Sequence, residues 1–404
     1  MSWEEERLAD FVARARGWLA ARAAPRPKST LEWGCGDDSV AIFQSLSHED
    51  ERAEIEAILA WQRCKSDAGF GSISWPVEYG GSGLPRTHED AFRRLEREFD
   101  VPASHEAVGI SLNIESPTVL ALGSDEQRRR WLPALRRGDS LCCQLFSEPG
   151  AGSDLGALST TAVRDGDGWR VNGQKVWTTG AQFADLGYLI ARTDPTAERR
   201  AAFTAFVIDM RSPGIEVRPL RQMSGGTSFN EVFLDDVRVP DADRLGEVGG
   251  GWHAAMTTLG FERVAGAGSG NGSAAIFDRL LLVARHRGRD RDPLVRQALA
   301  SIYCNSKVRT WTNQRAAAAV RRDGVPGPMG SVGKLAYSNG LTRLAEAAAL
   351  IVGSATVTDT GEWGTFAWSE LILGAPGMRI AGGSDEIQRN TIAERVLGLP
   401  KESR

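Results

Sequence analysis

The sequence predicts a multidomain α+β protein in which an antiparallel β domain lies between two α-helical domains. Apolar residues follow helical spacing in the first part of the chain, short β segments begin near residue 141, and helical alanine and leucine patterns return after residue 248. A chain of 404 residues is long enough for two or three packed units. We expect the domains to span residues 1–140, 141–247 and 248–404.

Helical periodicity and capping signals predict three helices in the N-terminal domain. Apolar residues recur every three or four positions over residues 8–19, and Pro25 follows them as a helix stop. A second helix runs through residues 55–61. A third helix begins at Ser124, where Gln127 stands three positions later and completes a capping-box pattern.

Short β segments with turn signals predict the middle domain. The segment GWRVNGQKVW (residues 168–177) has the Asn-Gly pair that a tight hairpin turn requires, so we expect a hairpin there. Further strands are predicted in TAFVIDM, GIEVRPL and EVFLDDVRVP. No crossover helix separates these segments, which favours antiparallel pairing.

Alanine and leucine at helical spacing predict a bundle of helices in the C-terminal domain. The last helix is expected to open at residues 384–386, where acidic side chains suit the positive end of the helix dipole. It is expected to end at Gly398 and Pro400.

Composition and charge argue against several functional classes. The formal net charge of −4 produces no field that attracts nucleic acid, and no apolar run approaches the roughly 20 residues of a membrane-spanning helix. The start, MSWEEERLAD, lacks the basic and apolar parts of a secretion signal. Five cysteines and five histidines show no metal-ligand spacing. We therefore expect a cytoplasmic protein with no metal, no nucleic-acid partner and no membrane span.

Two short segments carry the residue types of a ligand site. SEPGAGSD (residues 147–154) places glycines between hydroxyl side chains, so its backbone N–H groups can approach an anionic phosphate. KVWTTG (residues 175–180) offers an aromatic ring and two hydroxyls to a planar ligand such as an isoalloxazine. By themselves the two segments are also compatible with a glycine-rich turn and ordinary sheet packing.

These two segments belong to an ordered series of motifs. The series runs WPVEYGGSGL, GSDEQRRRWLP, QLFSEPGAGSDLGAL, KVWTTGA, FNEVFLDDVRVPDADRLGEVGGGW and GGSDEIQRNTIAERVLGLP. In this order the chain resembles the acyl-CoA dehydrogenase family along nearly its full length. The resemblance implies an FAD-dependent enzyme of fatty acid or lipid catabolism. Such an enzyme desaturates an acyl-CoA thioester by removing the α proton and passing the β hydride to flavin N5.

The resemblance also implies the binding residues and the partners. Homotetramers are usual in the family, and an electron-transfer flavoprotein is the expected electron acceptor. Carried over by position, the flavin contacts are Gln144, Phe146, Ser147, Gly152, Ser153, Trp177 and Thr179 in the β domain, and Ser384 and Glu386 near the C-terminus. Ser153 is also expected to reach the substrate.

The base of the reaction departs from one family pattern and matches another. Many members carry the catalytic glutamate in the C-terminal signature, where this chain has Gly382. Isovaleryl-type and long-chain-type members carry it before an arginine on the helix after the β domain, where this chain has Glu262 and Arg263. We therefore expect Glu262 to be the catalytic base, Arg263 to neighbour CoA, and the Gly382 N–H to polarise the thioester carbonyl. From local sequence alone, a surface Glu-Arg pair is the competing interpretation.

Other departures leave alternatives open. ARHRGRDRDPLVRQ has lost the phenylalanine-glycine pattern that reaches a neighbouring subunit's FAD, and ALIVGSATV keeps only Gly353 of its usual residues. A hetero-oligomer with a related chain accounts for both losses, with this chain as an active or a non-catalytic subunit. A flavin monooxygenase or oxidase of the same fold is a further alternative. The run GAGSGNG (residues 266–272) suggests a widened wall for a branched or cyclic acyl group, or else a tight helix crossing.

Overall fold

The computed structural model describes residues 7–27, 31–43, 45–197, 200–268, 272–323 and 327–401. The chain forms two compact units. Unit 1 takes in the described residues of Met1–Ser29, Leu46–Leu220 and Phe229–Thr258. Unit 2 takes in those of Thr30–Ser45, Arg221–Ser228 and Leu259–Arg404.

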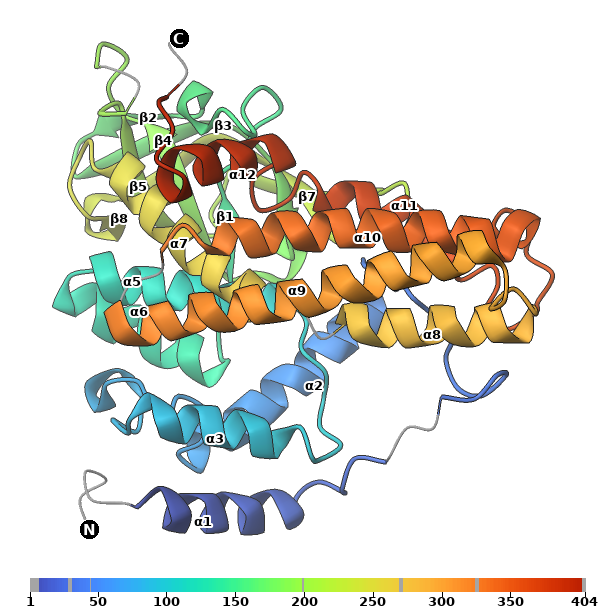
Figure 1. Cartoon of the computed structure of the whole chain (residues 1–404). Helices are drawn as coiled ribbons and strands as arrows, with labels where there is room; N and C mark the ends of the chain where they lie inside the picture. Colours follow the sequence, from blue (N-terminus) through green and yellow to red (C-terminus); the bar gives the residue numbers. More distant parts are fainter. Residues whose placement is uncertain are drawn as a thin grey trace. The chain divides into compact units, whose positions relative to one another are not determined.

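The helical part of unit 1 confirms the three predicted helices and adds others between them (Figure 1). Ser124 caps its helix through the predicted box, because its hydroxyl accepts from Gln127 N and the Gln127 side chain accepts from Ser124 N. The first helix ends five residues before Pro25. The helical elements are α1 (Leu8–Ala20), α2 (His48–Asp67), α3 (Arg86–Glu96), α4 (Glu106–Ile110), a π-helical turn (Ser111–Glu115), α5 (Ser116–Leu122) and α6 (Asp125–Arg137).

The strands of unit 1 form one eight-stranded sheet. They are β1 (Cys142–Leu145), β2 (Thr161–Asp165), β3 (Gly168–Thr179), β4 (Leu186–Arg192), β5 (Phe203–Asp209), β6 (Ile215–Leu220), β7 (Phe229–Pro240) and β8 (Arg244–Leu245). Their order is β6-β7-β3-β2-β4-β5-β8, and β1 pairs with β4 off this path. The predicted α+β class is confirmed, but the sheet is mixed rather than wholly antiparallel. Strand β1 runs parallel to β4, with Cys142 opposite Leu186, and the forty residues between them supply the long connection that parallel pairing needs.

The predicted hairpin within residues 168–177 is wrong. Those residues belong to the single strand β3, and the chain reverses earlier, between β2 and β3, where Asp165 pairs with Gly168. Gly166 has a φ of +59° in that turn. Asn172-Gly173 instead marks an irregularity in the pairing of β3 with β7, where the Asn172 side chain accepts from Asp236 N at 2.9 Å. An Asn-Gly pair serves a turn and a bulge equally well, because both need unusual φ values.

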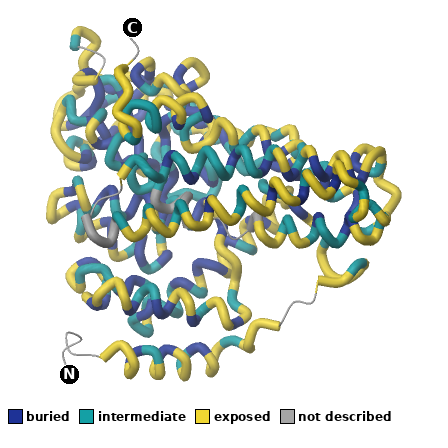
Figure 2. The backbone as a smooth tube through the Cα atoms, in the orientation of Figure 1, coloured by how far each residue is buried: buried dark blue, intermediate teal, exposed yellow. Residues whose placement is uncertain are grey.

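Unit 2 is a bundle of helices whose buried residues lie on one side of each helix. Helices α9 and α10 run side by side in Figure 1, and Figure 2 shows buried and exposed residues alternating along both. Leu280, Val295, Leu344 and Trp368 meet in its core. The helices are α8 (Gly272–His286), α9 (Pro293–Asp323), α10 (Gly330–Val352), α11 (Trp368–Met378), α12 (Asp385–Thr391) and a π-helical turn (Ile392–Val396); α7 (Gly251–Gly268) contributes its second half.

A segment from the N-terminal part of the chain also belongs to unit 2. Gly364 N donates to Asp38 Oδ2 at 2.7 Å, and the Trp363 indole N–H donates to the Gly36 carbonyl at 2.8 Å. The described residues of Thr30–Ser45 therefore cluster with the C-terminal helices. The three-domain boundaries given above stay a prediction.

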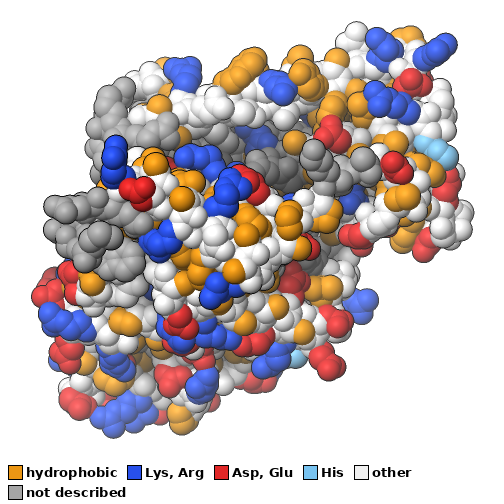
Figure 3. Space-filling model, turned by 90° about the horizontal axis from the view of Figure 1, so that it is seen from below, with side chains coloured by type: hydrophobic (Ala, Val, Ile, Leu, Met, Phe, Trp, Pro, Cys, Tyr) orange, Lys and Arg blue, Asp and Glu red, His pale blue; other side chains and the backbone are white. Residues whose placement is uncertain are grey.

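Figure 3 shows basic and acidic side chains interspersed over the face that it draws, with no unbroken basic stripe on it. Among the described residues, no helix is both long and apolar enough to cross a membrane. In the glycine run at 266–272, residues 269–271 lie outside the described residues, so the widened wall stays a hypothesis.

Candidate active site

A bulge in strand β3 presents an exposed indole ring. The pairing of β3 with β7 passes from Lys175 opposite Val232 to Thr178 opposite Asn230, so two residues of β3 face one of β7. Trp177 lies in this bulge with a φ of +63°, a left-handed conformation that is strained for a residue with a side chain. Trp177 is 61% exposed, lies near the end of β3 and makes an edge-to-face contact with Phe229. The backbone thus holds a large aromatic ring on the surface of unit 1.

The glycine-rich turn lies directly beside this bulge. Glu148 and Ala151 exchange two backbone hydrogen bonds of 3.0 Å, which close a tight turn around Pro149-Gly150. Val176 N donates to the Ser147 carbonyl at 2.9 Å, so the turn is attached to β3 one residue before Trp177. The structure therefore brings together SEPGAGSD and KVWTTG, the two segments that the sequence singled out.

The other predicted flavin contacts of unit 1 differ in exposure. Gly152 and Ser153 are exposed, and a Cβ on Gly152 meets nothing within 4 Å. Gln144, Ser147 and Thr179 are half-buried. Phe146 is buried with its ring against Tyr188, so its side chain belongs to the core.

A buried ion pair fixes the turn from below. Lys175 Nζ lies 2.8 Å from Glu148 Oε1 and also donates to the carbonyls of Phe146 and Ile190, at 3.2 and 2.9 Å. Glu148 accepts three further hydrogen bonds, from Ser159 N and Oγ and from Thr160 N. Every polar atom of both side chains is thus satisfied within unit 1, as burial of a charge pair requires.

The two charges shift each other's ionisation. Burial lowers the pKa of Lys175 to about 8, and Glu148 opposes that shift. Burial by itself raises the pKa of Glu148, but the Lys175 charge and the hydrogen bonds outweigh it and lower that pKa to about 2. The pair is therefore ionised near neutral pH.

These features fit a flavin nucleotide. An exposed aromatic ring can stack on a planar ring system, and the adjacent open turn with small residues lets backbone N–H groups approach phosphate oxygens. Among the described residues, no group of three or more His, Cys, Asp or Glu side chains could hold a metal ion.

In unit 2, Glu262 faces a turn of two glycines. Gly382 has a φ of +63° and Gly383 a φ of +83°, values that favour glycine. A Cβ placed on Gly382 would lie 3.2 Å from Glu262 Oε1. The half-buried carboxylate thus meets a position kept free of a side chain, and the predicted partners Glu262 and Gly382 do lie together.

Arg263 follows Glu262 and is also half-buried. Burial lowers the pKa of its guanidinium, Glu262 opposes the shift, and Arg395 adds to it. A guanidinium is a group that binds anionic ligands such as carboxylates and phosphates.

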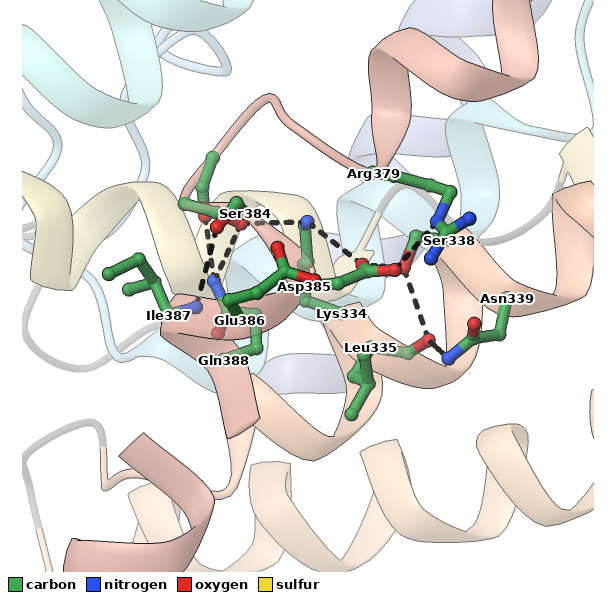
Figure 4. A network of polar contacts seen from close by, with 12 residues as sticks. Lys334, Leu335, Ser338, Asn339, Arg379, Ser384, Asp385, Glu386, Ile387 and Gln388 are labelled. Carbon is green, nitrogen blue, oxygen red and sulfur yellow. Dashed lines mark hydrogen bonds and ion pairs between the residues drawn. The ribbon is translucent and has the colours of Figure 1, made fainter. Parts of the chain in front are cut away.

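The start of helix α12 holds the last two predicted residues (Figure 4). Ser384 caps the helix by accepting from Ile387 N. Glu386 is exposed and pairs with Arg389 at 3.0 Å. Hydrogen bonds from its own backbone N–H and from Ser384 lower the pKa of Glu386.

Sequence reasoning missed three polar residues of this centre, namely Lys334, Ser338 and Asp385. Asp385 is buried and accepts from Ser338 Oγ at 2.7 Å and from Arg379 Nε at 2.8 Å. Burial raises the pKa of Asp385, but these bonds and the charges of Lys334 and Arg379 outweigh burial and lower it. The available signal was the spacing of Lys334 and Ser338, which places both on one face of α10 in an otherwise apolar pattern.

The whole chain is similar to known proteins. The family models described as acyl-CoA dehydrogenase N-terminal, middle and C-terminal domains match residues 42–139, 143–237 and 249–397. Acyl-CoA dehydrogenase IpdE1 of Mycobacterium tuberculosis is 37% identical over 98% of this chain and 98% of its own length. Acyl-CoA dehydrogenase FadE34 of the same organism is 37% identical over 86% of this chain and 48% of its own length.

Two solved structures are also similar to this chain. A variant of the Tcur3481-Tcur3483 steroid ACAD is similar with a TM-score of 0.75 and 25% identity, over 98% of this chain and 99% of that chain. The ChsE4-ChsE5 complex from Mycobacterium tuberculosis gives a TM-score of 0.72 and 26% identity, over 98% of both chains.

Proposed function

The chain belongs to the acyl-CoA dehydrogenase family, and we propose that it desaturates an acyl-CoA between the α and β carbons with Glu262 as the base. The family consists of flavoprotein oxidoreductases that act on CH–CH groups in lipid catabolism, so acyl-CoA oxidation is the general activity. Family membership by itself does not identify the base, the substrate or the binding residues, so these are part of the proposal.

The observation that carries the proposal is the meeting of Glu262 with Gly382. Proton removal from a carbon acid needs an ionised carboxylate beside an open space that the reacting carbon can enter. Glu262 supplies the carboxylate, and the lack of a side chain at Gly382 leaves the space next to its Oε1. The Glu262 carboxylate would take the proton as the α C–H bond breaks, and a backbone N–H of the glycine turn would bind the thioester oxygen.

For the cofactor we propose FAD. When bound, it supplies the acceptor that takes the β hydrogen with its electron pair. Trp177 and the turn Ser147–Asp154 would hold the ring system and the phosphates, while Ser384 and Glu386 would bind the nucleotide portion. The Lys175–Glu148 pair would keep the turn in shape before the cofactor arrives.

The acyl group is proposed from the relatives. Since one of the similar solved structures is that of a steroid ACAD, polycyclic and branched acyl-CoAs are the first substrates to assay. An electron-transfer flavoprotein is the proposed acceptor.

The test compares Glu262→Gln with Glu386→Gln, a matched loss of a carboxylate in the same unit. Under anaerobic conditions we expect Glu262→Gln to keep its flavin absorbance while flavin bleaching by the acyl-CoA slows at least about a hundredfold. Glu386→Gln should still be bleached, with any loss confined to flavin affinity. Wild-type-like bleaching in Glu262→Gln would remove this glutamate from the mechanism.

A second candidate is an accessory subunit of a two-chain enzyme. Two of the similar solved structures, Tcur3481-Tcur3483 and ChsE4-ChsE5, carry the names of two chains. If this chain purified alone binds flavin and is bleached by an acyl-CoA, the accessory role is rejected. If both properties need co-expression with a related chain, the accessory role is supported.

A further inference from the structure

The glycine turn that faces Glu262 is held by two side chains from different helices. Lys334 Nζ, from α10, donates to the Gly383 carbonyl at 2.8 Å. Gln388 Nε2, from α12, donates to the carbonyls of Gly382 and Gly383 at 2.9 and 3.1 Å. A turn of two left-handed glycines has few conformational restraints of its own, so these bonds help to fix its position, together with the backbone bond from Asp385 N to the Arg379 carbonyl. Of these two anchors, Lys334 is the one that carries a charge.

The charge of Lys334 is partly withdrawn from water. The Lys334 side chain is 18% exposed, and Asp385 Oδ1 lies 3.8 Å from its Nζ. Burial lowers the pKa of Lys334, while Asp385, Glu262 and Glu386 oppose the shift in that order. Lys334 Nζ bonds to Gly383, and a Cβ on the preceding Gly382 would lie 3.2 Å from Glu262 Oε1, so Lys334 and Glu262 approach the same turn. A nearby opposite charge favours an ionised carboxylate.

Other charged groups also act on Glu262, and Arg263 is one of them, because the charge of Glu262 opposes the lowering of the Arg263 pKa. Asp385 is buried and accepts hydrogen bonds from Ser338 and Arg379 (Figure 4), and it acts on Lys334 more strongly than Glu262 does. Glu386, exposed on α12, adds negative charge. Arg263 on α7 is adjacent to Glu262 in sequence. Arg395, in the π-helical turn after α12, helps to lower the pKa of Arg263.

We propose that Lys334 is the positioning residue of this centre: it holds the Gly382–Gly383 turn against Glu262 and keeps the Glu262 carboxylate ionised for proton removal. The inference rests on the proposed function, because it concerns the same base. It adds a lysine that touches neither of the reacting carbons and acts through Glu262 and the turn.

The test is the pH profile of kcat/KM for flavin reduction in Lys334→Met, Lys334→Gln and Lys334→Arg. Without the charge, in the Met and Gln variants, the acidic limb should move to higher pH by roughly one unit. The Arg variant keeps the charge and should leave the limb near its wild-type place, with a lower kcat if the turn is displaced. Lys307→Met, at an exposed position of α9, is the matched control and should match wild type.

Gln388→Leu separates anchoring from charge. It removes the neutral anchor, so kcat should fall while the acidic limb stays in place. Flavin absorbance and circular dichroism identify variants that fail to fold, and Lys334→Gln serves if Lys334→Met is one of them. If the charge-neutral variants retain flavin and show an unshifted acidic limb, the inference about Lys334 is overturned.

Different results would reject the proposed function and the inference about Lys334. If wild type reduces no flavin with any acyl-CoA, or if Glu262→Gln is fully active, the proposed function fails and the Lys334 inference falls with it. If wild type is active, Glu262→Gln is inactive and the acidic limb of the pH profile is the same in the Lys334 variants as in wild type, only the inference about Lys334 fails.

Discussion

Lys175 and Glu148 form a fully buried ion pair, with Nζ 2.8 Å from Oε1 and side chains 0% and 3% exposed. The pair connects β3, the strand that carries Trp177, to the glycine-rich turn beside it. Its position ties the stability of unit 1 to the shape of the predicted flavin site.

Lys175→Met should destabilise the protein by about 3–5 kcal/mol, because Glu148 is left buried without its counter-ion. We expect a lower urea midpoint and a lower flavin-to-protein absorbance ratio. The double variant Lys175→Met/Glu148→Gln should recover part of the lost stability, since no uncompensated charge remains. A single variant as stable as wild type would show that the pair contributes little.

Glu148 should make stability fall at acidic pH. Its pKa is about 2 in the folded chain against an ordinary 4.5, so the folded state binds this proton less readily than the unfolded state. The stabilisation is therefore present above pH 4.5 and is lost as pH falls from 4.5 toward 2. Urea midpoints measured across this range should decline less steeply in Glu148→Gln than in wild type. Equal slopes would contradict the assignment.

Trp177→Gly should weaken flavin binding by roughly tenfold, because the stacking surface is lost. The free energy of unfolding of the apoprotein should stay the same or rise, since glycine accepts the left-handed φ of +63° without strain. Flavin titration and thermal unfolding measure the two effects. Val163→Ala, which shortens another exposed apolar side chain of the same sheet, is the control and should leave flavin affinity unchanged.

Gly382→Ala should lower kcat/KM at least about tenfold. The new methyl group would lie 3.2 Å from Glu262 Oε1 and would also strain a φ of +63°. Gly361→Ala separates these causes, because Gly361 has a φ of +72° but nothing within 4 Å of its Cβ position. It should lose stability by about 1–2 kcal/mol while keeping kcat/KM. Equal kinetic losses in both variants would mean that strain, rather than crowding of Glu262, is responsible.

Local patterns were sufficient for the elements that depend on neighbouring residues. The capping box at Ser124, the helix start at Ser384 and the strands around residues 204–210 and 214–220 are encoded within a few positions, and the structure confirms them. The hairpin at residues 168–177 was wrong, because Asn172-Gly173 suits a bulge as well as a turn, and the partner strand β7 decides between them.

The sequence by itself determined the family, the order of helical and β parts, and the residue types of the candidate site, because ordered motifs and periodicity are local or collinear properties. Only the tertiary structure decided that β1 runs parallel to β4, that Trp177 is held outward in a bulge, and that Lys175 neutralises Glu148. It also decided that Lys334 bonds to the Gly382–Gly383 turn, more than forty residues after it in the chain, and that this turn faces Glu262. Those relationships depend on the packing of distant segments, which no local spacing specifies.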